Sequence, residues 1–163
     1  MINFNQNQIH QLLLRMDAQY GWGQEAPPNF QYEENLKLIQ VIRAELESLT
    51  FMNLDVDTQS AQDCYFYAEI IHIEKLLDEK KEESRNIDFN IRFSSFGNFV
   101  TALAKPSAPV PEKELFSITS NVLKKNGFVY IDSSWLINTL YDGIHKQPVV
   151  SQTSWWNRFF DYH

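Results

Sequence analysis

Cysteine is nearly absent from this sequence: Cys64 is the one cysteine among 163 residues. A single cysteine cannot form a disulfide within the chain or a cysteine-based zinc cluster. A chain without disulfides suits a reducing compartment, so we expect the protein in the cytoplasm. Cys64 could act as a nucleophile only if the fold placed a histidine beside it, whereas a buried and inert cysteine is the common case.

Glycine is scarce as well, with five residues in the chain. The sequence has no glycine-rich phosphate loop, no Gly-x-Ser-x-Gly turn and no His-Glu-x-x-His run. These are the patterns of nucleotide-binding proteins, serine hydrolases and zinc proteases. Motifs therefore predict no catalytic, cofactor-binding or metal-binding residues, and we expect the protein to need neither a metal nor an organic cofactor.

Basic residues are outnumbered: 14 Lys and Arg stand against 21 Asp and Glu, and the formal net charge is −7. Such a charge opposes attraction to phosphate backbones, so we expect no nucleic acid partner, and it draws a basic protein partner. The first eight residues lack both a basic flank and a continuous apolar stretch. They are predicted to be neither a secretion signal nor a membrane-spanning helix, and we expect no membrane partner.

Apolar and aromatic residues are plentiful, at 44% and 14% of the chain. They suffice for a sizeable core in a chain of one-domain size. The patterns predict a single α+β domain over residues 1–163, with a helical part at 1–85 and a sheet-containing part at 86–163. In this arrangement an N-terminal layer of about three helices packs on a small antiparallel sheet, and further short helices follow in the C-terminal half.

Apolar side chains at helical spacing predict the N-terminal helices near residues 6–20, 33–49 and 60–82. The first should end near Gly21, and the paired prolines 27 and 28 separate it from the second. The third has charged residues of both signs on its other faces. Its apolar stripe consists of Phe66, Ile70, Ile73 and Leu77.

The hydrophobic period changes to two at Ile87, where apolar and polar residues alternate through Phe93. This alternation predicts a strand over 87–93, and turn residues then lead into a returning strand over 98–104. A helix beginning at Glu112 precedes a third strand over 128–131. The next stretch, 132–150, is left open between helix and strand: a short helix could run from 132 through 140, or residues 136–141 could continue the sheet. The aromatic residues near 155–160 predict a short terminal helix docked on the sheet.

Asp55 and Asp57 are two carboxylates two residues apart, a spacing found in aspartate-dependent phosphatases and metal-binding sugar transferases. Those enzymes need a strand that leads into the pair, whereas here the pair is expected between two helices. A calcium loop also fails, because its sixth position is Ser60 and its twelfth is Phe66. We therefore expect the pair in a loop or a helix cap.

His72 and Glu74 offer a nitrogen and a carboxylate close together in sequence. On the expected helix they lie on different sides, whereas metal ligands on one helix need a spacing of three or four. Asp55, Asp57 and His72 are therefore candidate site residues only if the chain is an enzyme of a class that its motifs do not reveal.

The C-terminal third carries a pattern of aromatic residues and turns: Gly127 to Ile131, then Tyr141-Asp142-Gly143, then Trp155-Trp156-x-Arg158-Phe159-Phe160-x-Tyr162. This pattern resembles the ends of small acidic bacterial proteins, including immunity proteins of toxin–immunity systems. The resemblance implies a protein that binds a cognate toxin and blocks its active site or its substrate surface.

An acidic chain rich in Tyr and Trp suits association with a basic partner, since opposite charge speeds encounter and buried aromatics hold a complex. We therefore expect a non-enzymatic binding protein, in its specific form an immunity protein that neutralises a toxin with a basic domain by direct association. Two alternatives stay open: a hydrolase-type enzyme of unrecognised class, and a structural or adaptor protein whose helix at 60–83 packs on another subunit.

The four terminal rings are expected to be chiefly structural, with the partner surface elsewhere. Trp155 and Phe159 fall on one side of a short helix, and Trp156 and Phe160 fall on the next. One of the two pairs should therefore be buried.

Overall fold

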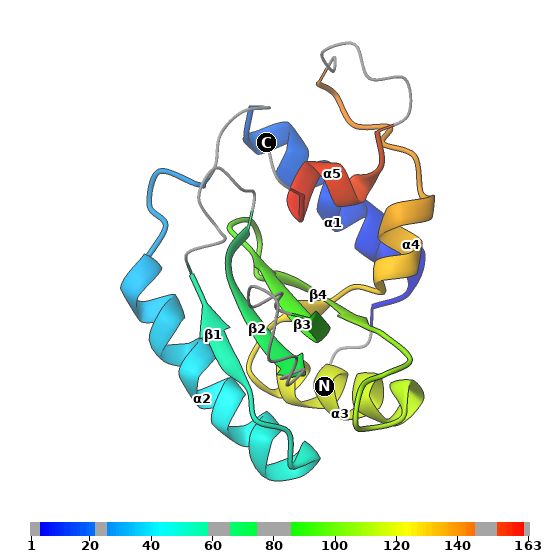
Figure 1. Cartoon of the computed structure of the whole chain (residues 1–163). Helices are drawn as coiled ribbons and strands as arrows, with labels where there is room; N and C mark the ends of the chain where they lie inside the picture. The colour runs from blue at the N-terminus through cyan, green and yellow to red at the C-terminus, as the bar shows by residue number, and fades with distance from the viewer. Residues whose placement is uncertain (1–3, 22–25, 59–65, 75–85, 146–152, 162–163) are drawn as a thin grey trace, which may run out of the picture.

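The computed structural model describes residues 4–21, 26–58, 66–74, 86–145 and 153–161. Helices and strands are interspersed along these ranges (Figure 1), which confirms the α+β class. In chain order the elements are α1 (Gln6–Gln19), α2 (Tyr32–Thr50), β1 (Asp55–Asp57), β2 (Phe66–Glu74), β3 (Asn86–Ser94), β4 (Phe99–Ala104), α3 (Glu112–Lys125), β5 (Val129–Tyr130), α4 (Ser133–Asn138) and α5 (Trp155–Phe159).

The strands form one five-stranded sheet in the order β1-β2-β3-β4-β5. The hairpin predicted from the alternating residues is confirmed as β3 and β4, with Phe93 opposite Val100. Its turn passes through Gly97 and Asn98, which have φ values of 62° and 54°. A Cβ at Gly97 would lie 2.7 Å from the Cε of Met16, so glycine lets α1 approach the turn closely.

The last strand, β5, runs parallel to β4, which corrects the expectation of a purely antiparallel sheet. The connection between the two strands holds the whole of α3. A parallel pair needs such a crossover, because a short hairpin turn returns the chain in the opposite direction. The predicted helix from Glu112 and the predicted strand over 128–131 are both present, and only their relative direction was wrong.

The helix predicted near 60–82 is wrong, because residues Phe66–Glu74 form strand β2. The other parts of that predicted helix lie outside the described residues. β2 lies between β1 and β3, and every residue from Phe66 to Ile71 is buried. A strand covered on both faces shows no alternation of polar and apolar residues, so its apolar run matched a helical period by chance. Strands therefore begin before residue 80, and residues 1–85 are not a purely helical part.

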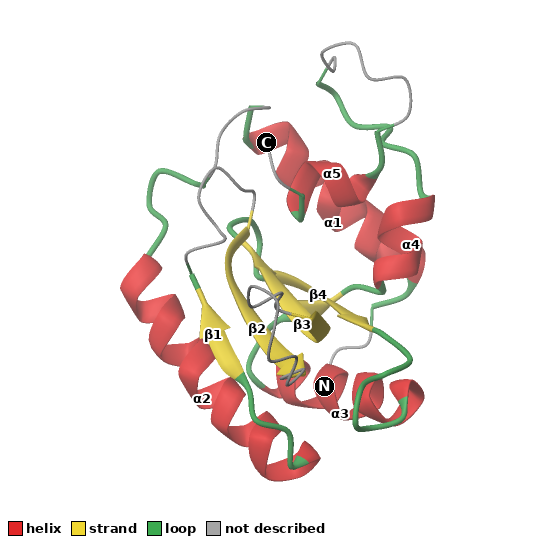
Figure 2. Ribbon diagram, in the orientation of Figure 1, coloured by secondary structure: helices red, strands yellow, loops and turns green. Residues whose placement is uncertain are grey.

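One face of the sheet packs against α2 and α3, and these helices also pack against each other. Figure 2 shows both helices beside the sheet, away from the group formed by α1, α4 and α5. Most sheet residues of this core are two positions apart along their strands, as expected for residues that share one face of a sheet. They include Ala68, Ile70, Phe89, Ile91, Phe93, Val100 and Ala102.

A second core joins α1, α4 and α5 to the end of the sheet. The predicted docking of the terminal aromatic helix is confirmed, since Trp155, Phe159 and Phe160 have no exposed surface. Trp156 is half-buried. The open alternative at 132–150 is decided in favour of a helix for Ser133–Asn138, whereas Leu140 forms a β-bridge with Ser154 and residues 146–150 lie outside the described residues. The first turn of the helix is capped by Asp132: the N–H of Trp135 donates to Asp132 Oδ1 at 3.0 Å.

No helix in the described parts of the chain is long and apolar enough to cross a membrane.

Candidate functional site

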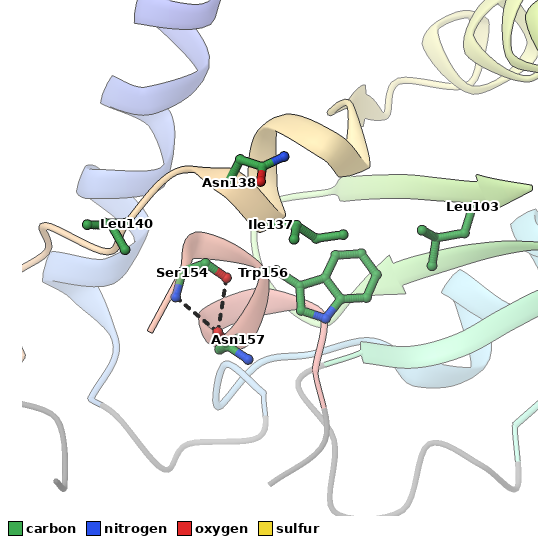
Figure 3. A pocket seen from close by; sticks show the side chains of 7 residues that line it. All are labelled: Leu103, Ile137, Asn138, Leu140, Ser154, Trp156 and Asn157. Carbon is green, nitrogen blue, oxygen red and sulfur yellow. Dashed lines mark hydrogen bonds between the residues drawn. The ribbon is translucent and has the colours of Figure 1, made fainter. Parts of the chain in front are cut away.

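An open pocket of about 590 Å³ lies where α4, α5 and the end of β4 meet (Figure 3). Its volume is in the range of pockets that accept small ligands. Six of its seven lining residues come from the C-terminal segment, and one comes from β4. They are Leu103, Ile137, Asn138, Leu140, Ser154, Trp156 and Asn157.

The apolar wall of this pocket is partly open to solvent. Ile137 is 48% exposed and Leu140 is 64% exposed, and the indole of Trp156 stands between Ile137 and Leu103 in Figure 3. Exposed large apolar side chains that gather around a hollow mark binding surfaces more often than scattered ones do. The pocket therefore offers apolar contact area that the chain itself leaves uncovered.

The polar wall is held in place by hydrogen bonds within the chain. The N–H and the hydroxyl of Ser154 both donate to Asn157 Oδ1 at 3.0 Å (dashed in Figure 3). The amide of Asn157 donates in turn to Asp161 Oδ2 at 2.5 Å. The amide of Asn138 donates to the carbonyl of Ser134 at 2.7 Å. These bonds fix the orientations of the three polar lining residues.

Leu140 reaches the pocket from a short β-bridge with Ser154. The N–H of Tyr141 donates to the carbonyl of Thr153 at 2.8 Å, and the N–H of Trp155 donates to the carbonyl of Thr139 at 3.1 Å. The two bonds flank Leu140, so the rim of the pocket is a two-stranded ladder.

A buried carboxylate on α1 anchors the segment that follows Leu140. Asp17 has no exposed surface, and its oxygens accept from the Tyr141 hydroxyl at 2.6 Å, the Ile144 N–H at 3.0 Å and the Arg158 Nε at 2.7 Å. Burial, and then the hydrogen bond to Asp17, raise the pKa of Tyr141, so its hydroxyl remains a donor. A Cβ at Gly143 would collide with the Asp17 carboxylate and the Tyr141 ring, so only glycine fits there.

Arg92 of β3 packs its guanidinium on the ring of Trp156. Its guanidinium lies over two aromatic rings, 4.6 Å from the ring centre of Phe66 and 5.2 Å from that of Trp156. Its Nε donates to Glu69 Oε1 at 2.5 Å, and its NH1 donates to the carbonyl of Phe160 at 2.8 Å. Cation–π contacts and charge-assisted bonds together fix the pocket wall to the sheet.

The structure does not bring the sequence candidates into one site. Asp55 and Asp57 lie on β1, the edge strand, opposite Ile71 and Glu69, so the expectation of a loop or helix cap is wrong. Asp55 and Asp57 are two residues apart on the strand, so both side chains lie on the same face of the sheet. Glu69 and Arg92 lie on this face too, because Asp57 pairs with Glu69 and Glu69 pairs with Arg92.

His72 lies on β2 rather than on a helix, and its Nδ1 is 2.6 Å from Asp88 Oδ1. The carboxylate of Asp88 is almost fully buried, so it orients the ring of His72. Among the described residues, no three His, Cys, Asp or Glu side chains gather closely enough to hold a metal ion.

Sequence reasoning missed the pocket residues Ile137, Asn138 and Leu140 because it left the secondary structure of 132–140 open. If residues 133–138 are taken as a helix, the sequence does indicate an exposed apolar position. On a helix over 133–138, Trp135 and Leu136 point toward the core, whereas Ile137 is an apolar residue at an outward position. An outward apolar residue beside an exposed Leu140 indicates a contact surface.

The chain was compared with models of known protein families, with curated proteins and with solved structures, and no match was found.

Proposed function

We propose that this chain is a non-enzymatic binding protein and that the pocket between α4 and α5 receives an apolar side chain of a protein partner. One observation carries the proposal: Ile137 and Leu140 are exposed beside the indole of Trp156 around an open hollow. Binding energy at protein interfaces concentrates in such places, where an aromatic or aliphatic side chain of one protein fills a pocket of the other.

The partner that suits this surface is basic. The two segments that supply most of the pocket, 132–145 and 153–161, carry the partly or fully exposed aspartates 132, 142 and 161. Their single arginine, Arg158, has no exposed surface. The whole chain adds a net charge of −7. Acidic residues on the segments that form an apolar pocket speed association with a basic surface and disfavour acidic competitors.

A toxin is the specific partner that we propose, with the cytoplasm as the place where it is neutralised. Support comes from the C-terminal aromatic pattern, which resembles that of immunity proteins and overlaps the segments that form the pocket. Trp156 belongs to this pattern and lines the pocket. The proposal thus places the partner surface beside the terminal rings, whereas the sequence had suggested a surface elsewhere.

The test compares three tagged forms of the full chain purified from the native host: the parent, Ile137→Lys and Val41→Lys. Val41 is the matched control, because it is an apolar residue of α2 that is 58% exposed and does not line the pocket. We expect the parent and the control to retain the same basic protein at equal yield, and Ile137→Lys to retain it about tenfold less.

The binding is then repeated with the purified partner by titration calorimetry. Equal affinity of Ile137→Lys and the parent for this partner would contradict the proposal. So would a retained protein that carries a net negative charge.

A further inference from the structure

The backbone of Leu140 forms an open edge beside the pocket. In an antiparallel pair of strands, alternate residues form no hydrogen bonds to the other strand, whereas the residues before and after them do. The N–H and C=O of such a non-bonded residue point away from the other strand. Leu140 occupies that position, since the bonds run through Thr139 and Tyr141. Neither backbone group of Leu140 bonds to any described residue. The N–H of Leu140 can therefore donate, and its C=O can accept, one hydrogen bond on the outer edge of the ladder.

We infer that the partner presents an extended, basic segment that pairs with Leu140 as a third strand and places one apolar side chain in the pocket. This inference rests on the proposed function and adds its mode of recognition. Addition of a strand to an exposed edge gives affinity through main-chain hydrogen bonds, and pockets for alternate side chains give specificity. Leu140 supplies the edge, and its side chain lines the pocket.

The edge is held rigid before any partner arrives. On one side it is joined to residues 153–155 by the two ladder bonds. On the other side the next residues are tied to α1, because Tyr141 and the N–H of Ile144 donate to Asp17 and His145 Nε2 lies 2.8 Å from the Asp17 carbonyl. A preformed edge saves the entropy that ordering a loop would otherwise cost on binding.

The geometry favours a short strand over a helix as the partner element. A bound helix needs a groove that accepts apolar residues at positions i, i+3, i+4 and i+7. Here one pocket adjoins one extended stretch, and the chain bends after Asp142. The exposed aspartates 132 and 142 flank this stretch in sequence, so basic residues on both sides of the buried side chain complement it.

A random heptapeptide library displayed on phage tests the inference on the intact protein. We expect the enriched peptides to carry a central Phe, Leu, Ile or Trp flanked by Lys or Arg. Each enriched peptide is then synthesised with one backbone amide N-methylated at a time, which removes one donor and keeps the side chain. Methylation at the residue that pairs with Leu140 should weaken binding by about five- to tenfold, and methylation at a terminal residue should have no effect.

Two protein variants complete the design. Leu140→Pro removes the amide donor as well as the side chain, and Leu140→Ala removes the side chain alone, so their difference reports the backbone bond. We expect Leu140→Pro to bind the peptides more weakly than Leu140→Ala, and a melting curve checks that both variants fold. The N-methylated peptides give the same information if Leu140→Pro does not fold.

The outcomes separate the two proposals. If Ile137→Lys abolishes peptide binding but no N-methyl position matters, or if the enriched peptides bind as helices by circular dichroism, strand pairing is overturned and the pocket function stands. If Ile137→Lys binds the peptides as well as the parent, the pocket function fails. A library that yields no binder also contradicts strand pairing, since a seven-residue strand is all that it requires.

Discussion

The carboxylate of Asp17 and the guanidinium of Arg158 form an ion pair 2.7 Å long, and neither residue has any exposed surface. The two residues are 141 positions apart in sequence, at the end of α1 and within α5. The same arginine donates through NH2 to the carbonyl of Tyr20 at 2.8 Å and lies over the rings of Phe96 and Phe159. The pair therefore fastens the pocket-bearing segment to the first helix.

Replacement of Asp17 by Asn should destabilise the protein strongly. The variant keeps the shape of the side chain but leaves the charge of Arg158 buried without its counter-ion, a change that costs about 3–5 kcal/mol. Chemical denaturation measures the free energy of unfolding. Asp55→Asn is the control, because Asp55 is exposed on β1 and should change stability by less than about 0.5 kcal/mol. Equal unfolding curves for both variants would falsify the role of the pair.

The terminal rings should separate into structural and contact residues. Trp155→Ala and Phe159→Ala remove fully buried rings and should each lower the free energy of unfolding by about 3–5 kcal/mol. Trp156→Ala removes a half-buried ring and should destabilise less, while it weakens partner binding. Thermal unfolding without any partner tests this order. A melting temperature for Trp156→Ala as low as that of Trp155→Ala would place Trp156 in the core instead.

Gly143→Ala should be far more harmful than Gly21→Ala. The added methyl group at Gly143 meets the Asp17 carboxylate and the Tyr141 ring, whereas a Cβ at Gly21 meets nothing within 4 Å. We expect a loss of about 1–3 kcal/mol for Gly143→Ala and a change of less than about 0.5 kcal/mol for Gly21→Ala. The denaturant concentration at the midpoint of unfolding measures this difference. Similar midpoints for the two variants would mean that residues 141–145 rearrange around the added methyl group without a loss of stability.

Stability should fall at alkaline pH. Burial raises the pKa values of Tyr67, Tyr130 and Tyr141, with an added contribution from Asp132 at Tyr130 and from the Asp17 hydrogen bond at Tyr141. The native state therefore keeps these protons at a pH where the unfolded chain releases them, near the ordinary tyrosine value of about 10. Stability is fully present below that pH and is lost as the pH rises above it.

The loss of stability at alkaline pH should be smaller in Tyr141→Phe than in the parent, because this variant lacks one of the three tyrosine hydroxyls whose pKa is raised by folding. The free energy of unfolding measured at several pH values between about 8 and 11 gives the slope for each protein. A slope that is unchanged in Tyr141→Phe would show that this hydroxyl does not titrate differently in the folded state.

The accuracy of the sequence prediction followed the pattern of polar and apolar residues in each element. The strand β3 was foreseen, because its apolar residues alternate with Asp88, Asn90 and Arg92, although Asp88 and Asn90 are buried as well. β2 was missed, because apolar residues occur on both of its faces, as at the adjacent Ile70 and Ile71, and this hides the alternation of a strand. The direction of β5 depends on how α3 crosses the sheet, which no local pattern encodes.

The candidate site was harder to predict, because its residues act in pairs that are far apart in sequence. Tyr141 is 124 positions from Asp17, and Arg92 is 68 positions from the Phe160 carbonyl that it binds. Each of these residues is ordinary in its own neighbourhood. His72 was noticed for its proximity in sequence to Glu74, yet the side chain that it contacts belongs to Asp88 on the next strand.

The attachment of α1 to residues 141–158 bears on how the chain acquires its shape during synthesis. Translation proceeds from the N-terminus, so α1 emerges from the ribosome well before Tyr141 and Arg158 do. Until then Asp17 has none of the three donors that surround it in the finished protein. We expect the nascent helix to remain undocked, with Leu13 and its apolar neighbours uncovered, while α2, α3 and the sheet that they cover assemble. Helix α1 would thus be made before the other described helices and yet be among the last to reach its place.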